Sequence, residues 1–152
     1  MNYKNKKYPQ LNVPVVSPEL DEQENELKIR CLSRNKLLVA TPEEWVRQHL
    51  LLYLTQDLNF PKSLVSVERL LTVNGLKKRW DILVYNGKGE PEILVECKRP
   101  SIAIDKSTLE QALRYQSELN CRYLILSNGL QHYLFENKKE GISPLSEFPV
   151  YK

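Results

Sequence analysis

Apolar and polar residues alternate along residues 80–100, which is the most regular pattern in the chain. Successive side chains of a β-strand point to opposite faces, so this alternation predicts two strands joined by a turn at residues 86–89. One face of the predicted hairpin is entirely apolar and is expected to form part of the core. It consists of Trp80, Ile82, Val84, Ile93, Val95 and Cys97.

The opposite face of the predicted hairpin carries charge, because Asp81, Glu96 and Lys98 lie there beside two leucines. We expect Asp81 to lie opposite Glu96. The same register pairs Leu83 with Leu94, and a slip of one residue would divide both faces at once. Three ionisable groups on a largely apolar hairpin call for a functional explanation.

A helix is predicted over residues 41–56. Thr41 is a suitable N-cap, Pro42 suits the first helical position, and Glu44 completes a capping box. The apolar face of this helix consists of Val46, Leu50, Tyr53 and Leu54.

The two glutamates of this helix are expected to differ in orientation. At 100° per residue, Glu43 falls near the apolar face and Glu44 lies away from it. Glu43 also stands one turn before Arg47. Two interpretations of Glu43 therefore stay open, an inward-facing carboxylate and an exposed helical ion pair with Arg47.

The remaining pattern predicts further strands and a second helix. Strands are expected at residues 27–32, 36–40, 64–73, 121–127 and 131–136. Ser107 and Glu110 form another capping box that opens a helix to about Leu119. The sheet-facing stripe of that helix is Leu109, Ala112, Leu113 and Gln116. Because a strand, helix and strand of this length imply a right-handed crossover between parallel strands, we predict a mixed α/β fold (α+β), with a central mixed β-sheet flanked by helices.

The 152 residues fit one domain. Residues 1–26 are polar, with three prolines and an acidic run, and are expected to form an extended, partly disordered arm. Residues 27–136 hold the predicted elements, and residues 137–152 are a polar tail. No phosphate-binding loop is present, because the glycines of residues 86–89 join two strands and not a strand and a helix.

Composition restricts the function further. The net charge of +3 permits a polyanionic partner without arguing strongly for one. No apolar run approaches the ~20 residues of a membrane span, and no apolar segment follows the basic N-terminal residues, so we expect neither a membrane anchor nor an export signal. The expected location is the cytoplasm.

The three cysteines have no metal-type spacing and suit reduced thiols; they are Cys31, Cys97 and Cys121.

Asp81 and Glu96 on neighbouring strands, with Lys98 two residues further on, suit a hard divalent cation. Mg²⁺ prefers one or two carboxylates and takes water and phosphate oxygens as its other ligands. It would polarise a phosphodiester and acidify its bound water, while Lys98 would help to position that water and offset charge on the phosphate. The alternative is a set of solvated strand charges or a cross-strand pair, worth under ~1 kcal/mol.

Asp81, followed by Glu96-Cys97-Lys98 after the hairpin turn, resembles the active-site motif of the PD-(D/E)XK nuclease superfamily. Over roughly residues 27–136 the chain resembles the nuclease domains related to the N terminus of type I restriction enzyme R subunits. The segments that carry this resemblance are 41–48 (TPEEWVRQ), 67–69 (VER), 80–85 (WDILVY), 95–100 (VECKRP), 110–115 (EQALRY) and 127–129 (SNG). The resemblance implies a restriction-endonuclease-like core that cleaves DNA with Mg²⁺, or with Mn²⁺ in its place.

The same resemblance implies roles for individual residues. Asp81 and Glu96 correspond to metal ligands, and the backbone carbonyl of Cys97 completes the metal site. Lys98 serves the attacking water. A glutamate of the first helix often joins these groups, and the helical periodicity favours Glu43 over Glu44.

Gln111 and Tyr115 resemble the Gln-x-x-x-Tyr motif of RecB-like nucleases and type I R subunits. They lie one helical turn apart, on a flank of the predicted helix away from its leucines. We expect both to support the site; the alternative is an exposed glutamine and a half-buried tyrosine. Two features depart from the pattern, since Trp80 stands where the superfamily name has proline and the motor of the R subunits is absent.

Basic residues near the motif are candidates for phosphate contacts, with a solvated rim as the alternative. They are Lys77, Lys78, Arg79, Arg99, Lys106 and Arg114.

The sequence and its resemblance therefore predict a metal-dependent DNA endonuclease domain. The alternative is a non-catalytic module of the same fold that binds DNA or a protein partner in a restriction or defence complex. Expected partners are DNA and restriction or motor subunits supplied by other chains, and a homodimer is left open.

Overall fold

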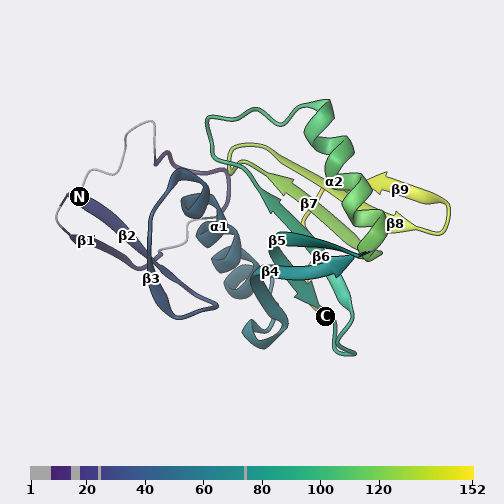
Figure 1. The fold of residues 1–152 in the computed structure, drawn as a ribbon, viewed down its shortest axis with the longest axis horizontal. Coiled ribbons are helices and arrows are strands. Elements are labelled where there is room, and N and C mark those ends of the chain that lie inside the picture. The colour runs from purple at the N-terminus through teal and green to yellow at the C-terminus, as the bar shows by residue number, and fades with distance from the viewer. Residues whose placement is uncertain (1–7, 15–17, 24, 74) are drawn as a thin grey trace.

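The computed structural model describes residues 8–14, 18–23, 25–73 and 75–152 (Figure 1), with the backbone alone at residues 23, 68–73, 76–78, 115 and 118. Within this part of the chain, two β-sheets and two principal helices form the mixed α/β fold that the sequence predicts.

The smaller sheet is antiparallel and has the order β1-β2-β3. Its strands are β1 (Leu20–Gln23), β2 (Glu26–Cys31) and β3 (Lys36–Val39). The β2–β3 hairpin was expected from residues 27–40. β1 was not expected, because it lies in the stretch predicted as an extended arm. Within the described residues of that stretch, β1 pairs with β2 in a sheet.

The larger sheet has six strands in the order β4-β5-β6-β7-β8-β9. Its strands are β4 (Val65–Val73), β5 (Leu76–Tyr85), β6 (Pro91–Cys97), β7 (Tyr123–Ser127), β8 (His132–Lys138) and β9 (Gly141–Pro144). Only the β6–β7 pair is parallel among these neighbours, which confirms the predicted crossover. Residues 137–152 are therefore more than a tail, because they include the end of β8 and all of β9.

The β5–β6 hairpin has the predicted register. Leu83 pairs with Leu94 and Ile82 with Val95, which brings Asp81 beside Glu96. Among the described pairs, the β5–β6 ladder ends there, and the N-terminal half of β5 pairs with β4 alone.

Trp80 corrects the prediction for the apolar face. It is buried, but it packs with Leu83 and Leu94 and not with Ile82. Strict alternation fails at this point because the residues of β5 that precede Ile82 do not pair with β6, so the geometry of a regular two-strand ladder does not apply to them.

α1 (Pro42–Leu52) covers one face of the hairpin and continues as a π-helical turn, η1 (Tyr53–Asp57). A short 3₁₀ turn, η2 (Lys62–Leu64), then leads into β4. The Glu44 backbone N–H donates to Thr41 Oγ1 at 3.1 Å, which confirms the predicted N-cap. The core between α1 and the sheet includes Val46, Leu50, Leu54, Ile82, Val84, Ile93 and Val95.

α2 (Lys106–Leu119) covers the opposite face of the sheet (Figure 1). Its buried stripe is the predicted one, with Ala112 and Gln116 buried and Leu109 and Leu113 partly buried. The predicted capping box at Ser107 is wrong. Asp105 is the N-cap, since its backbone is extended and its carboxylate accepts the Thr108 N–H at 2.8 Å, while Ser107 already lies inside the helix.

Residues 8–14 contact both α1 and the turn between β7 and β8. Trp45 Nε1 of α1 donates to the Pro9 carbonyl at 3.0 Å, and the Asn12 N–H donates to the Gly129 carbonyl at 2.7 Å. Leu11 is buried against Gly129, so closely that a Cβ at that glycine would stand 2.6 Å from a leucine methyl. This segment therefore fixes the β7–β8 turn to α1.

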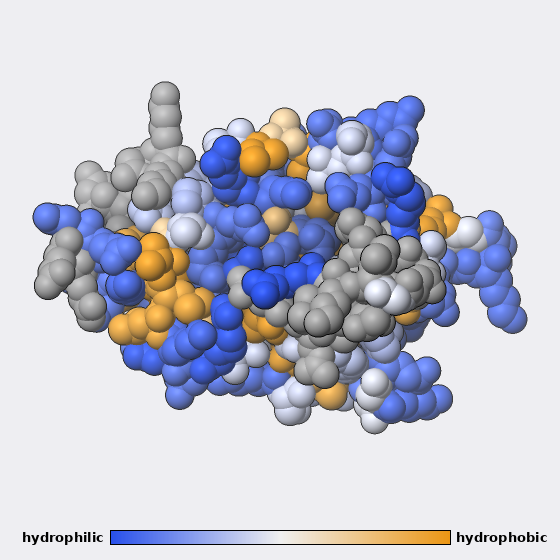
Figure 2. All heavy atoms as spheres, in the orientation of Figure 1, coloured by the Kyte–Doolittle hydropathy of each residue, from blue (hydrophilic) through white to orange (hydrophobic). Residues whose placement is uncertain are grey.

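None of the helices in the described ranges is long and apolar enough to cross a membrane. The face drawn in Figure 2 is mostly hydrophilic, with apolar side chains gathered around β3, where Val39 is 44 % exposed. The cysteines are free and buried, as expected for Cys31, Cys97 and Cys121.

Candidate active site

Asp81 lies at the point where β5 and β6 separate, and both of its carboxylate oxygens are hydrogen-bonded. Oδ1 accepts from Arg47 Nη2 at 2.8 Å, and Oδ2 accepts from the backbone N–H of Cys97, also at 2.8 Å. The Asp81 side chain is 15 % exposed. Its orientation is therefore fixed from α1 on one side and from β6 on the other.

Glu96 lies next to Asp81 in a more enclosed environment. Within the described part of the chain, its Oε1 atom is buried without a hydrogen-bond partner. Burial, and then the nearby Asp81 carboxylate, raise the pKa of Glu96 to about 8, although Lys98 opposes this shift. A carboxyl group in this state strongly favours a positive charge beside it.

Lys98 and Gln111 open onto the same small cavity as Glu96. This cavity of about 70 Å³ lies between the end of β6 and α2, and Thr108 also lines it. The Lys98 backbone N–H donates to the Ser127 carbonyl at 2.8 Å, which fixes the residue against β7. The structure thus brings together Asp81, Glu96, Lys98 and Gln111, as the sequence predicted.

Arg47 is the central cation of the site, and the sequence interpretation treated it only as a partner for Glu43. Its Nη1 donates to Glu44 at 2.8 Å, and its Nη2 donates to Glu43 at 3.2 Å as well as to Asp81. Burial alone would lower the pKa of Arg47, but Glu44 and Asp81 outweigh it and raise the pKa. The signal in the sequence was its spacing of three and four residues from the two glutamates.

For Glu43 the structure agrees with the exposed helical ion pair with Arg47, one of the two interpretations that the sequence left open, whereas the outward orientation predicted for Glu44 is wrong. Glu44 is buried and is held by Arg47 and by Gln48 Nε2, which donates to its Oε2 at 3.0 Å. Glu43 is 48 % exposed, although it is close enough to Asp81 for that carboxylate, together with burial, to raise the pKa of Glu43. The helical periodicity did not predict the burial of Glu44, because Arg34, in the turn between β2 and β3, approaches it to 3.8 Å.

The residues present fit a magnesium ion through the Asp81–Glu96 pair. Among the described side chains, no three of the His, Cys, Asp and Glu type are arranged to hold a metal. Mg²⁺ needs only one or two carboxylates, since water and phosphate oxygens supply its other ligands. Such an ion would also give Glu96 Oε1 the partner that the described residues do not provide.

The remaining site predictions have different outcomes. The side chains of Tyr115, Lys77 and Lys78 lie outside the described residues. Arg79, Arg99, Lys106 and Arg114 are all exposed, as phosphate-binding groups would be. Lys106 and Arg114 lie on α2 with Gln111, and Arg99 directly follows Lys98.

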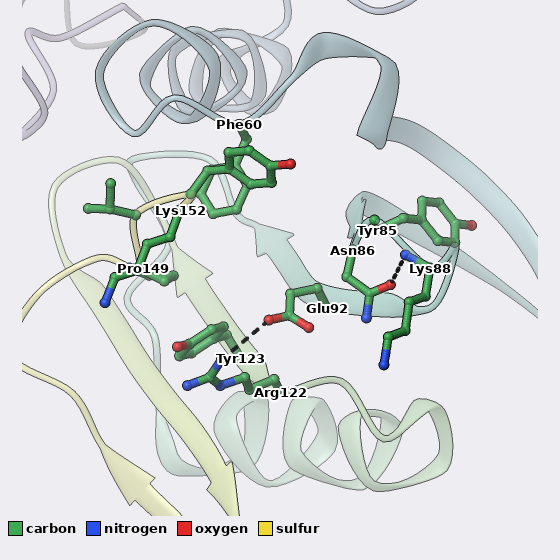
Figure 3. A pocket seen from close by; sticks show the side chains of 12 residues that line it. Phe60, Tyr85, Asn86, Lys88, Glu92, Arg122, Tyr123, Pro149 and Lys152 are labelled. Atoms are coloured by element: carbon green, nitrogen blue, oxygen red, sulfur yellow. Dashed lines mark hydrogen bonds and ion pairs between the residues drawn. The ribbon is translucent and has the colours of Figure 1, made fainter.

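A larger cavity of about 500 Å³ lies at the other end of the hairpin, beside the turn at residues 86–88 (Figure 3). Phe60, Tyr85 and Tyr123 contribute to its walls. Arg122 is placed 3.8 Å from Glu92 and 3.2 Å from Glu136, so its charge is neutralised. None of the predicted catalytic residues lines this cavity.

The two histidines have structural partners. His49 Nδ1 lies 2.7 Å from the Trp45 carbonyl, within α1, as expected for a histidine packed on its helix. His132 contacts Ser127 Oγ through Nδ1 and the Asn12 carbonyl through Nε2, both at 2.7 Å. The sequence gave no indication of the long-range contact between His132 and Asn12.

These observations define a mixed α/β domain whose central hairpin carries two carboxylates and a lysine beside a buried arginine. The profile of the family described as type I restriction enzyme R protein N terminus (HSDR_N) matches residues 42–149. The chain therefore belongs to this family, which confirms the resemblance seen in the sequence.

Other comparisons add little. No curated protein matches the chain. The solved fragment structure of a putative HsdR subunit of a type I restriction enzyme from Vibrio vulnificus YJ016 is 21 % identical to this chain and superposes with a TM-score of 0.42. The match covers 57 % of this chain and 19 % of the Vibrio vulnificus chain. The chain spans about a fifth of that structure's length, and a similarity at this level carries no argument about function.

Proposed function

We propose that this domain is a metal-dependent DNA endonuclease that hydrolyses phosphodiester bonds with Mg²⁺, or with Mn²⁺ in its place. The observation that carries the proposal is the convergence of Asp81, Glu96 and Lys98 at the open end of the β5–β6 hairpin, with Gln111 reaching the same cavity from α2. The family to which the chain belongs is consistent with this activity.

Asp81, Glu96 and the backbone carbonyl of Cys97 are the groups that would hold the ion. When bound, the ion would acidify a water molecule and polarise the phosphate. Lys98 would orient that water and offset the charge that develops on the phosphate, since its ammonium lies near the carboxylates of Glu43 and Glu96. Gln111 would donate a hydrogen bond to the substrate at the mouth of the cavity.

DNA contacts in this proposal come from the exposed cations Arg79, Arg99, Lys106 and Arg114, with Lys77 and Lys78 as further candidates. Contacts to phosphates give strong dependence on salt and little reading of sequence. Restriction or motor subunits are the proposed protein partners. A cytoplasmic location and a homodimer stay predictions.

A plasmid-nicking assay with Mg²⁺ or Mn²⁺ tests this proposal. The wild-type chain is expected to convert supercoiled DNA to the nicked form, and Glu96→Ala and Lys98→Ala to lose at least ~100-fold in rate. Lys139→Ala, in the exposed turn between β8 and β9, is the matched control and should keep full activity. Unchanged nicking by Glu96→Ala and Lys98→Ala would refute the proposal.

One observation favours a second candidate, a non-catalytic module that binds DNA or a protein partner. Both oxygens of Asp81 already accept strong hydrogen bonds, one of them from a buried guanidinium, so the apo site is stable without a metal. This candidate predicts DNA binding that depends on salt, is unchanged by EDTA, and is not followed by cleavage.

A further inference from the structure

The guanidinium of Arg47 bridges two carboxylates that the sequence predicted as metal ligands. Its Nη2 lies 2.8 Å from Asp81 Oδ1 and 3.2 Å from Glu43 Oε1. Two carboxylate oxygens that approach one point in this way are the usual ligands of a divalent cation. Here a nitrogen of the protein takes that central position.

Arg47 is held firmly in this position. Its side chain is 7 % exposed, and its second terminal nitrogen, Nη1, donates to Glu44 at 2.8 Å. Glu44 is itself buried and accepts a hydrogen bond from Gln48. Arginine stays charged in proteins, and its planar fork matches carboxylates on two sides. A metal ion entering between Glu43 and Asp81 would have to displace a cation that is already desolvated and paired.

We infer that Arg47 takes the place of a second metal ion, so that this site binds a single divalent cation through Asp81 and Glu96. The inference rests on the proposed function, because it specifies the metal content of the same site. It assigns Glu43 to the arginine and not to the metal, and it makes Arg47 a positioning residue for Asp81.

The net charge of the ionisable side chains around Arg47 is consistent with the binding of one divalent cation. Four carboxylates face three cationic side chains, which gives a formal net charge of −1 when all are ionised. The members are Glu43, Glu44, Asp81 and Glu96 with Arg34, Arg47 and Lys98. One divalent cation would bring this cluster to +1, which a phosphate of the substrate neutralises. Two would bring it to +3 in a partly buried site, where unbalanced charge is strongly unfavourable.

The exposed position of Glu43 permits a direct test that spares the fold. Isothermal titration calorimetry with Mn²⁺ on the full chain should give a stoichiometry of one. Glu43→Gln should keep that stoichiometry, with Kd changed less than about threefold, since a glutamine oxygen still accepts from Arg47. Asp81→Asn should weaken binding at least tenfold, and Glu140→Gln in the β8–β9 turn is the matched control.

Removal of the arginine tests the same inference in the opposite direction. The Arg47→Gln variant should bind two Mn²⁺ ions per chain. The double variant Arg47→Gln/Glu43→Gln should again bind one Mn²⁺ ion per chain. Thermal melts check that each variant is folded, and if Arg47→Gln does not fold, the Glu43→Gln titration alone decides.

The outcomes separate this inference from the proposed function. Two ions in the wild type, one of which is lost in Glu43→Gln, would overturn the inference while leaving the nuclease proposal in place. One ion in both proteins, without any nicking of DNA, would support the inference and contradict the nuclease proposal. A wild-type chain that binds no Mn²⁺ would overturn both.

Discussion

Replacement of Glu96 by glutamine should stabilise the metal-free protein at neutral and alkaline pH. In the folded chain the pKa of Glu96 is raised from the ordinary value of 4.5 to about 8 by burial and by Asp81. Between these values the folded state holds a proton that the unfolded state has released. The unfolded state therefore gains stability relative to the folded state as the pH rises through this window.

The magnitude follows from the size of the shift. One pKa unit corresponds to about 1.4 kcal/mol, so the cost attributable to Glu96 should grow from under ~1 kcal/mol at pH 5 to roughly 4 kcal/mol near pH 8. Glutamine has nearly the same shape and no titratable proton. The difference in unfolding free energy between Glu96→Gln and the wild type should therefore follow that rise and level off above pH 8.

Urea denaturation in EDTA, followed by tryptophan fluorescence, measures this difference. Trp45 and Trp80 are both buried, so their emission reports global unfolding. Glu140→Gln, in an exposed turn, corrects for the loss of one carboxylate in general. If the wild-type and Glu96→Gln stabilities run parallel from pH 5 to pH 8, then Glu96 has an ordinary pKa and our account of its environment is wrong.

Three further substitutions test the framework around the site by urea denaturation. Arg47→Leu should cost about 3–5 kcal/mol, since it leaves the buried Glu44 and the largely buried Asp81 without their shared cation; a cost under 1 kcal/mol would contradict the buried ion network. Thr41→Ala should cost about 1 kcal/mol through the lost N-cap of α1, while Thr41→Ser should restore most of it. Gly129→Ala should cost about 1–2 kcal/mol or more in unfolding free energy, because φ is +85° at this position and Leu11 blocks the new methyl group. The same substitution should speed proteolysis near residues 8–14. Unchanged proteolysis would show that this segment does not depend on the β7–β8 turn.

The elements of the site could be predicted from sequence because their signals are local. Alternation fixed the β5–β6 register, and a slip would have exposed leucines that the structure buries fully. The crossover through α2 followed from the element order. The supporting role expected for Gln111 came from the resemblance to the Gln-x-x-x-Tyr motif.

Several failures depend on contacts between distant segments, whereas the N-cap of α2 is set locally by Asp105. Trp80 changed sides where β5 separates from β6, a feature that the residues of one strand do not encode. Arg34, in the turn between β2 and β3, approaches the buried Glu44 to 3.8 Å. β9 was missed because an edge strand that is mostly exposed has no need of apolar alternation.

The contact between Arg47 and Asp81 has a consequence for how the domain matures. Asp81 belongs to the large sheet, but only one of the two hydrogen bonds that orient its carboxylate comes from that sheet, and the other comes from α1. A chain in which α1 has not docked would thus lack one of the two bonds that orient the aspartate. Under the proposed nuclease function, cleavage would depend on the docking of α1, because only then is the Asp81 carboxylate held from both sides.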